Sequence, residues 1–437
     1  MTNKLPQDYK GNGEVNEYDE EKKNTRKEEV VMRCNPVLLE YNSSIRGVLG
    51  YLRSRVCPEK NLIPLGQGDA SAFACFRAPL SLEDALVDST RSCKFNGYAH
   101  SYGVPETRSA VAEYVSIGLP YKLSHSDVYL TVGCSQAIHL CLTVLATKGS
   151  NILLPRPGFP VYETECGYNG IEIRFYDLIP EKNWEVDLDH VEALADDKTV
   201  AMVVINPSNP CGAVFSYEHL SKIAKTAERL KFPIVSDEVY AHMVFGQNKF
   251  FPMAIFASVT PVITLGGISK RWLIPGWRFG WIATCDPHGI LKKEKVQEGL
   301  EMLMNVTPGP PTVIQGAVPS VLRDTSQEFH DEILHLLETA ADICYNRIKK
   351  IKSLCCYSRP QGSMFIMVKI NISTFKDIKD DMEFASTLVN EESVIVLPGS
   401  TLGMKNWIRI LFAAPSSLLE DAWGRIESFC QRHANTL

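Results

Sequence analysis

The stretch LGGISKRWLIPGWRFGWIAT, residues 265–284, predicts two apolar strands joined by a turn. Three cations, Lys270, Arg271 and Arg278, lie in it among three tryptophans. A lysine in apolar surroundings loses hydration, which lowers its pKa and favours the neutral amine. The neutral amine is the form that makes Schiff bases with carbonyl compounds. The stretch therefore predicts a nucleophilic lysine, Lys270, just after a strand.

The composition restricts the class of protein around this stretch. The chain has 437 residues, of which 45% are hydrophobic and 22% charged, which predicts a globular protein with more than one domain. A net charge of -6 at pH 7 argues against a nucleic-acid or anionic-membrane surface. No apolar run is long enough to span a bilayer. We expect no nucleic-acid partner and no membrane partner.

The cysteines and the first residues indicate the compartment. The 13 cysteines are scattered and form neither a C-x-x-C pair nor a Cys/His spacing, so no metal site is expected. Residues 1–35 mix acids with bases and lack an apolar segment, which is typical of a disordered tail and not of a targeting signal. Free thiols without a secretory signal predict a cytoplasmic protein.

Short apolar runs alternate with amphipathic stretches, which predicts an α/β fold with a mostly parallel sheet covered by helices on both faces. The predicted strands are 128–132, 151–155, 172–177, 200–206, 233–238, 262–267 and 280–285, with helices at 134–149 and 216–232 between them. Beyond residue 316 the chain predicts a smaller α+β domain: a long helix at 326–353, strands at 364–370, 393–399 and 407–413, and a last helix at 416–433.

Ligands of open α/β sheets bind at the carboxyl ends of the strands, and polar clusters follow five predicted strands there. The residues at these strand ends are Gly133 with Cys134, Ser135 and Gln136; Phe159; Asn209; Asp237 with Tyr240; and Ser269 with Lys270 and Arg278. Each cluster has a plain structural alternative. Gly133 to Gln136 can be an ordinary helix start, Phe159 a core residue, and Asp237 a helix cap.

The ordered set G-C-S-Q-A, P-R-P-G-F-P-x-Y, N-P-S-N-P-C-G, S-D-E-V-Y and S-K-R-W-x-x-P-G-W-R-x-G-W resembles the fold-type I pyridoxal-phosphate-dependent aminotransferases. It is most similar to the plant tyrosine aminotransferase-like group, which includes aromatic aminotransferases, nicotianamine aminotransferases and C–S lyases. The resemblance covers about residues 45–434. It implies a large domain with a seven-stranded sheet (76–315) and a small domain built from 36–75 and 316–437.

The resemblance implies pyridoxal 5'-phosphate as cofactor and a role for each motif residue. Lys270 would form the Schiff base and move the substrate proton, Asp237 would keep the pyridine nitrogen protonated, and Tyr240 would complete the catalytic group. Asn209 and Tyr240 would hydrogen-bond the phenolic oxygen, and Phe159 would stack on the ring. The phosphate would be bound by Cys134, Ser135, Gln136, Ser269 and Arg278. Relatives often carry a serine where this chain has Gly267, which removes one expected hydroxyl contact.

The same resemblance assigns the substrate and subunit contacts. Arg409, in a buried-looking strand, would bind the substrate α-carboxylate, and Gly68 and Asn209 would also contact the substrate. Tyr98 would reach the phosphate of the neighbouring subunit, which implies a homodimer with shared active sites. The roles of Arg271 and His100 stay open, although an ion pair is expected for Arg271.

The expected reaction is transfer of the amino group of tyrosine or phenylalanine to a 2-oxo acid through a Schiff base on Lys270. A C–S lyase and a nicotianamine aminotransferase are the alternatives on the same scaffold. A non-catalytic paralogue is disfavoured because the complete residue set is retained. A nucleotide-binding Rossmann enzyme is disfavoured because no G-x-G-x-x-G opens a helix.

Overall fold

A computed structural model describes residues 34–36 and 45–435. The predicted disordered tail, 1–35, therefore lies outside the described residues except for its last two. No helix in the described part is long and apolar enough to cross a membrane.

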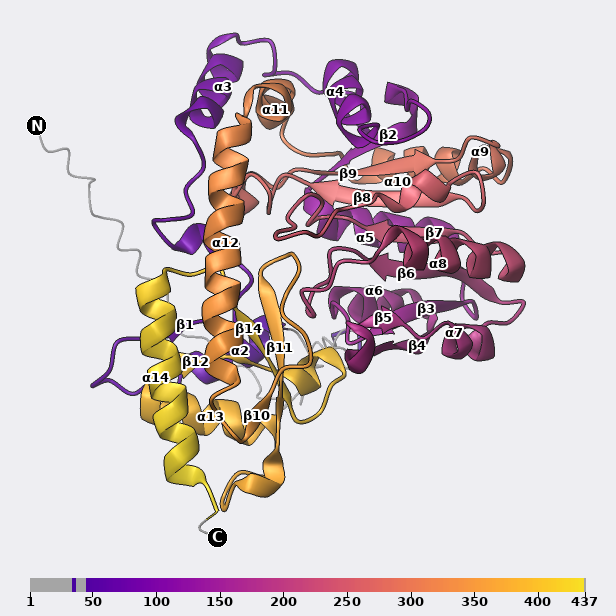
Figure 1. The fold of residues 1–437 in the computed structure, drawn as a ribbon. Helices are drawn as coiled ribbons and strands as arrows, with labels where there is room; N and C mark the ends of the chain where they lie inside the picture. The colour runs from indigo at the N-terminus through magenta and orange to yellow at the C-terminus, as the bar shows by residue number, and fades with distance from the viewer. Residues whose placement is uncertain (1–33, 37–44, 436–437) are drawn as a thin grey trace, which may run out of the picture. The chain divides into compact units, whose positions relative to one another are not determined.

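The larger sheet has eight strands in the order β2-β9-β8-β7-β6-β3-β4-β5 (Figure 1). All seven predicted strands are present: β2 (Val128–Thr131), β3 (Asn151–Arg156), β4 (Glu172–Ile179), β6 (Thr199–Ile205), β7 (Ile234–Asp237), β8 (Val262–Gly267) and β9 (Gly280–Cys285). The addition is β5 (Glu185–Val186), which pairs antiparallel with the edge strand β4. Two residues are too few to give a periodic pattern, so the sequence did not predict β5.

Both faces of this sheet are covered, as the continuous apolar strands predict. Along β6, Met202 and Val204 belong to the core shared with α8 (Tyr217–Leu230). The alternate residues Ala201 and Val203 belong to a second core, shared with α5 (Gly133–Leu145) and α10 (Val296–Val306). Because the strands run mostly parallel, their carboxyl ends and the loops that follow them meet along one edge.

The helices of the described chain frame the two sheets. Besides α5, α8 and α10 they are α2 (Ile45–Arg53), α3 (Leu80–Arg91), α4 (Pro105–Val115), α6 (Val161–Asn169), α7 (Leu188–Leu194), α9 (Ile290–Lys293), α11 (Thr312–Asp324), α12 (Gln327–Ile348), α13 (Asp381–Glu392) and α14 (Ser416–His433). Figure 1 shows the long α12 reaching from α11 to the smaller sheet, with α14 beside it.

The smaller sheet is antiparallel, with the order β10-β11-β14-β13. Its strands are β10 (Leu354–Cys355), β11 (Phe365–Ile370), β13 (Leu397–Pro398) and β14 (Trp407–Leu411). The single strand predicted at 393–399 is instead two. The first, β12 (Val394–Ile395), pairs in parallel with β1 (Ile63–Pro64), while β13 pairs with β14. A segment close to the N-terminus is thereby fixed to the C-terminal part of the chain.

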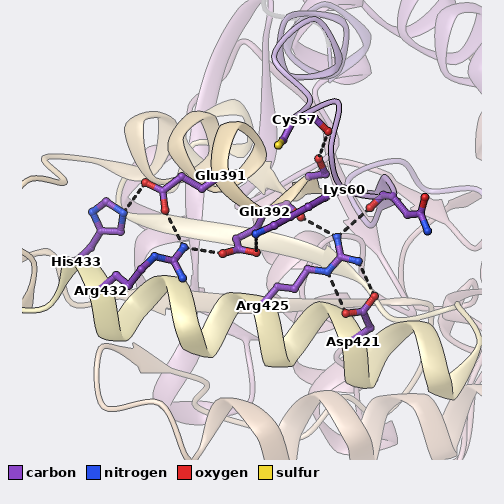
Figure 2. Close-up of polar contacts among 10 residues, drawn as sticks. Cys57, Lys60, Glu391, Glu392, Asp421, Arg425, Arg432 and His433 are labelled. Atoms are coloured by element: carbon purple, nitrogen blue, oxygen red, sulfur yellow. Dashed lines mark hydrogen bonds and ion pairs between the residues drawn. The ribbon is translucent and has the colours of Figure 1, made fainter.

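A network of charged side chains strengthens this connection (Figure 2). Glu392, whose side chain is only 5% exposed, binds Lys60 and Arg432, each at 2.6 Å. Arg425 donates to the carbonyl oxygens of Asn61 and Glu392, both at 2.9 Å. The residues that lead into β1 are therefore held against α13 and α14.

Candidate active site

A cavity of about 880 Å³ lies at the carboxyl ends of the parallel strands. The larger sheet contributes the start of α5 and the loops after β6, β7 and β8. The smaller sheet contributes β11 and β14, and the N-terminal segment contributes α2 and residues 67–69. The predicted site residues that line it are Gly68, Cys134, Ser135, Phe159, Asn209, Asp237, Tyr240, Ser269, Lys270, Arg278 and Arg409. Gln136 and Tyr98 are the two predicted residues that do not.

One end of the cavity is built for an anion. Helix α5 begins at Gly133, whose φ of +74° is one that side-chain-bearing residues rarely adopt. A Cβ atom at Gly133 would lie 2.5 Å from Nη2 of Arg278, so the glycine lets this guanidinium approach the first turn of the helix. Gln136 caps the same turn, because its Oε1 accepts a hydrogen bond of 2.6 Å from the Val132 N–H. A cation beside free helix N–H groups favours a bound phosphate or carboxylate.

Asp237 lies at the centre of the cavity wall, at the end of β7, and is only 3% exposed. Burial raises the pKa of its carboxyl group, and hydrogen bonds oppose that effect. The donors are the Val239 N–H (3.2 Å), the Tyr162 hydroxyl (3.1 Å) and the Cys134 thiol (3.8 Å). No cationic side chain forms an ion pair with Asp237 in the described chain, so its charge is free to act on a ligand.

Lys270 follows β8 and is half-buried. Burial is the main cause that lowers the pKa of its amine to about 8, and the charges of Arg409 and Arg278 act in the same direction. The direction of this pKa shift is the one expected from its apolar surroundings. Its Nζ donates a hydrogen bond of 2.7 Å to the Gly68 carbonyl oxygen. A Cβ atom at Gly68 would lie 2.7 Å from Cζ of Phe365, so a larger residue here would have to displace that ring.

Arg409 lies on β14 and is 2% exposed, so it belongs to the buried side chains of the chain. Its guanidinium donates to Oδ1 of Asn209 (2.9 Å) and to the Gly66 carbonyl oxygen (3.0 Å), and it stacks 4.1 Å from the centre of the Phe365 ring. Its Nε has no partner, and within the described residues no carboxylate pairs with it. Burial lowers the pKa of Arg409 to about 10. A buried cation bonded only to neutral groups favours an anionic ligand.

Tyr240 and Asn209 complete the wall between Asp237 and Arg409. Both are buried, with exposures of 3% and 8%. Burial raises the pKa of Tyr240, which keeps its hydroxyl protonated and able to donate. Lys270 Nζ lies 5.9 Å from the centre of the Tyr240 ring. Asn209 therefore contacts Arg409 directly, and the Tyr240 ring lies beside Lys270.

Sequence reasoning missed several residues of the site. Tyr162 was quoted within a motif without a function, although its hydroxyl binds Asp237. Phe365 lies under the Arg409 guanidinium. Arg46 and Arg53, seven residues apart on α2, both line the cavity. Their spacing on an amphipathic helix was a usable signal, because residues seven apart share a helix face.

Three further positions were singled out in the sequence. Gly267 is closely packed, because a Cβ atom there would lie 2.9 Å from the Phe279 carbonyl oxygen, and the missing hydroxyl contact stays a prediction. The ion pair expected for Arg271 is absent from the described chain. Arg271 instead donates to the Tyr114 hydroxyl (3.2 Å) and packs on Trp272. His100 stacks on Tyr102.

Comparison with known proteins agrees with this geometry. Residues 60–426 match the family "Aminotransferase class I and II". The chain is 48% identical to a probable aminotransferase of Arabidopsis thaliana, over 90% of this chain and 96% of that protein. It is 50% identical to nicotianamine aminotransferase 1 of Oryza sativa subsp. japonica, over 85% of this chain and 75% of that protein.

Lyases and a solved structure are also similar. The chain is 45% identical to an S-alkyl-thiohydroximate lyase of Arabidopsis thaliana, over 90% of this chain and 85% of that protein. The crystal structure of tyrosine aminotransferase from Leishmania infantum superimposes with a TM-score of 0.87 at 35% identity, over 93% of this chain and 99% of that one. On its fold, its strand-end residues and these similarities, the chain belongs to the class I and II aminotransferase family.

Proposed function

We propose that this enzyme transfers the amino group of an aromatic amino acid, tyrosine or phenylalanine, to a 2-oxo acid. The observation that carries the proposal is the buried, unpaired Arg409 facing the same cavity as the low-pKa amine of Lys270. Together they provide a carboxylate-binding cation and a nucleophile for one small amino acid. The apolar lining, which includes Leu49, Ile138 and Phe365, suits an aromatic side chain.

Pyridoxal 5'-phosphate is the cofactor of this class of enzyme, and the cavity fits it. The close approach of Arg278 to the first turn of α5 provides the charge and the N–H groups that a phosphate requires. The buried Asp237 carboxylate, free of any ion pair in the described chain, suits a protonated ring nitrogen. Once bound, the cofactor supplies an electron sink for the negative charge that develops at the substrate Cα.

The remaining chemistry belongs to residues of this chain. Asp237 holds the proton on the ring nitrogen. Lys270 would take the proton from the substrate Cα as a general base and, as a general acid, deliver it to the C4′ carbon of the cofactor instead of returning it to Cα. Asn209 and Tyr240 hydrogen-bond the phenolic oxygen of the cofactor, and Arg409 orients the substrate through its α-carboxylate.

Arg46 and Arg53 bear on the choice of substrate. A substrate with a second carboxylate requires a second cation, and the sequence argument assigned only Arg409. Because both arginines of α2 line the cavity, an acidic 2-oxo acid is a suitable amino-group acceptor at the same site. The proposal of an aromatic amino donor is therefore supported by the apolar lining of the cavity. It does not depend on the absence of further cations.

We also propose that the enzyme is a homodimer with shared active sites. Tyr98 is fully exposed and does not line its own cavity. Val306, 81% exposed, lies on a segment joined to that of Tyr98 by a hydrogen bond between Ser101 and Asn305. Exposed apolar side chains on neighbouring segments are typical of a surface that a second subunit covers.

The test is a panel of amino donors and 2-oxo acids in which keto-acid and thiol products are both quantified. We expect keto acid from tyrosine or phenylalanine only when a 2-oxo acid is added. Release of thiol from a cysteine conjugate without any 2-oxo acid would instead assign the lyase reaction. Preferential turnover of nicotianamine would assign the third alternative.

A further inference from the structure

The Asp237 carboxylate is held by donors from three separate elements. The Val239 N–H and the Cys134 thiol both donate to Oδ1. Oδ2 accepts from Tyr162 alone within residues 34–36 and 45–435, at 3.1 Å. Tyr162 comes from the first turn of α6, whereas Cys134 comes from α5 and Asp237 from β7. The rotation of the carboxylate about its χ2 bond is therefore fixed on one side by this phenol.

The chemistry of Tyr162 suits a permanent donor. Its side chain is 1% exposed and does not line the cavity, so it lies behind the wall that substrate and cofactor would face. Burial, and next to it the charge of Asp237, raises the pKa of the Tyr162 hydroxyl well above its ordinary value. The phenol therefore stays protonated at ordinary pH. The hydrogen bond that it donates to Oδ2 stabilises the ionised form of the Asp237 carboxyl group.

The need for such a donor follows from burial. Desolvation raises the pKa of the Asp237 carboxyl group and so favours the neutral acid, whereas the proposed function requires the carboxylate. Hydrogen bonds to an ionised group are stronger than those to a neutral one. Removing the Tyr162 hydroxyl would leave Oδ2 without its protein donor in a dry environment.

We propose that Tyr162 is a positioning residue that orients the Asp237 carboxylate toward the ring nitrogen of the cofactor and keeps it ionised. The proposal rests on the role of Asp237 in the proposed function. What it adds is that the Tyr162 hydroxyl affects the reaction only through the Asp237 carboxylate.

Tyr162→Phe removes one oxygen atom and keeps the ring that fills the core. The matched control is Tyr176→Phe, because Tyr176 is also 1% exposed and its hydroxyl donates to a backbone carbonyl oxygen, that of Val203, at 2.6 Å. We expect the two variants to lose similar stability in thermal unfolding. Only Tyr162→Phe should retain cofactor poorly, measured as its loss from the holoenzyme on dialysis, with a rate increased roughly 10-fold or more.

The pH profile gives a second readout. Loss of the phenol raises the pKa of the Asp237 carboxyl group, so the acid limb of kcat should move to higher pH in Tyr162→Phe and stay in place in Tyr176→Phe. KM should change little, because Arg409 is untouched. A variant with 3-fluorotyrosine at position 162, a stronger donor of the same shape, should move the limb to lower pH, and it keeps the test valid if Tyr162→Phe fails to fold.

The variant Asp237→Asn distinguishes a failure of the role of Asp237 from a failure of the role of Tyr162. If Asp237→Asn retains wild-type cofactor retention and kcat, the role of Asp237 fails and the proposal for Tyr162 fails with it. If Asp237→Asn is impaired while Tyr162→Phe behaves like Tyr176→Phe, only the role of Tyr162 is overturned. Support requires that Tyr162→Phe adds little further loss in the Asp237→Asn background, because the phenol acts through the carboxylate.

Discussion

Lys270 Nζ donates a 2.7 Å hydrogen bond to the Gly68 carbonyl oxygen, which joins the lysine after β8 to the segment that follows β1. The same segment presents the Gly66 carbonyl oxygen to Arg409. One short stretch of backbone therefore contacts the proposed nucleophile and the proposed carboxylate-binding cation together. Both contacts are to neutral oxygens, so neither Lys270 nor Arg409 is paired with a carboxylate there.

The lowered pKa of Lys270 predicts its reactivity. In the cofactor-free enzyme the neutral fraction of this amine should rise through about pH 8, whereas an ordinary lysine requires about pH 10.4. Reductive methylation at a series of pH values, read for each lysine by mass spectrometry, measures this directly. The exposed lysines of the same sample are the internal reference. A midpoint for Lys270 equal to theirs would contradict the prediction.

Borohydride treatment of the holoenzyme should fix the cofactor to the peptide that contains Lys270. Lys270→Ala should abolish turnover and still bind cofactor, because Asp237 and Arg278 remain. Label on a different lysine would refute the assignment of the nucleophile.

Arg409→Gln should raise KM for amino-acid substrates roughly 10- to 100-fold, which corresponds to the loss of a charged hydrogen-bonding partner worth about 1.5–3 kcal/mol. Arg108 is the matched control. It is also buried, packs 4.5 Å from the centre of the Tyr102 ring and donates to the Val128 carbonyl oxygen, yet it does not line the cavity. Equal KM values in Arg409→Gln and Arg108→Gln would contradict the carboxylate-binding role.

Tyrosine or phenylalanine should be turned over faster than aspartate, since burial of an aromatic side chain contributes about 1.5–3 kcal/mol. Double substitution of Arg46 and Arg53 by glutamine should raise KM for a dicarboxylic 2-oxo acid more than KM for a monocarboxylic one. Initial rates with both acceptors measure the difference. If aspartate is the best donor, the aromatic assignment is wrong.

A shared active site predicts complementation between two inactive subunits. Lys270→Ala and Tyr98→Ala should each lower activity strongly as homodimers. In a hybrid dimer, one site then carries both defects and the other is intact, so activity should exceed that of both parents. Co-expression with two different affinity tags isolates the hybrid. No gain in verified hybrids would refute the contact of Tyr98 with the neighbouring subunit and leave Lys270 unaffected.

The Glu392 network predicts a measurable contribution to stability. Glu392→Gln should lower the free energy of unfolding by roughly 1–3 kcal/mol, because it leaves Lys60 and Arg432 without their buried partner. Glu192→Gln should change it by no more than about 0.5 kcal/mol, because the pair of Glu192 with Arg229 is exposed on both sides. Urea unfolding of both variants provides the comparison.

The sequence predicted the elements that carry strong local patterns. Strands β8 and β9 begin and end where expected, because their runs are buried on both faces and a turn separates them. The prediction of a single strand at 393–399 was wrong. Its division into β12 and β13 depends on pairing with two different distant strands, β1 and β14, and no local sequence pattern encodes that.

The predicted site residues came from motifs at strand ends, and the resemblance to a family supplied their roles. The structure brings all but Gln136 and Tyr98 to one cavity. The donation of Tyr162 to Asp237 was not predictable, because it depends on how α6 packs against α5. The two arginines of α2 reach the cavity only through the tertiary placement of that helix. The cytoplasmic location stays a prediction.

The pairing of β1 with β12 also orders the events of protein synthesis. The ribosome makes the chain from its N-terminus, so Ile63 is complete long before Val394, its partner, exists. The strands of the larger sheet are all available by residue 285 and can associate first. The pairing of β1 with β12 and the contact of Gly66 with Arg409 can form only after Val394 and Arg409 have been synthesised. In a nascent chain the wall of the cavity built from the larger sheet can therefore form before β14 and Arg409 exist.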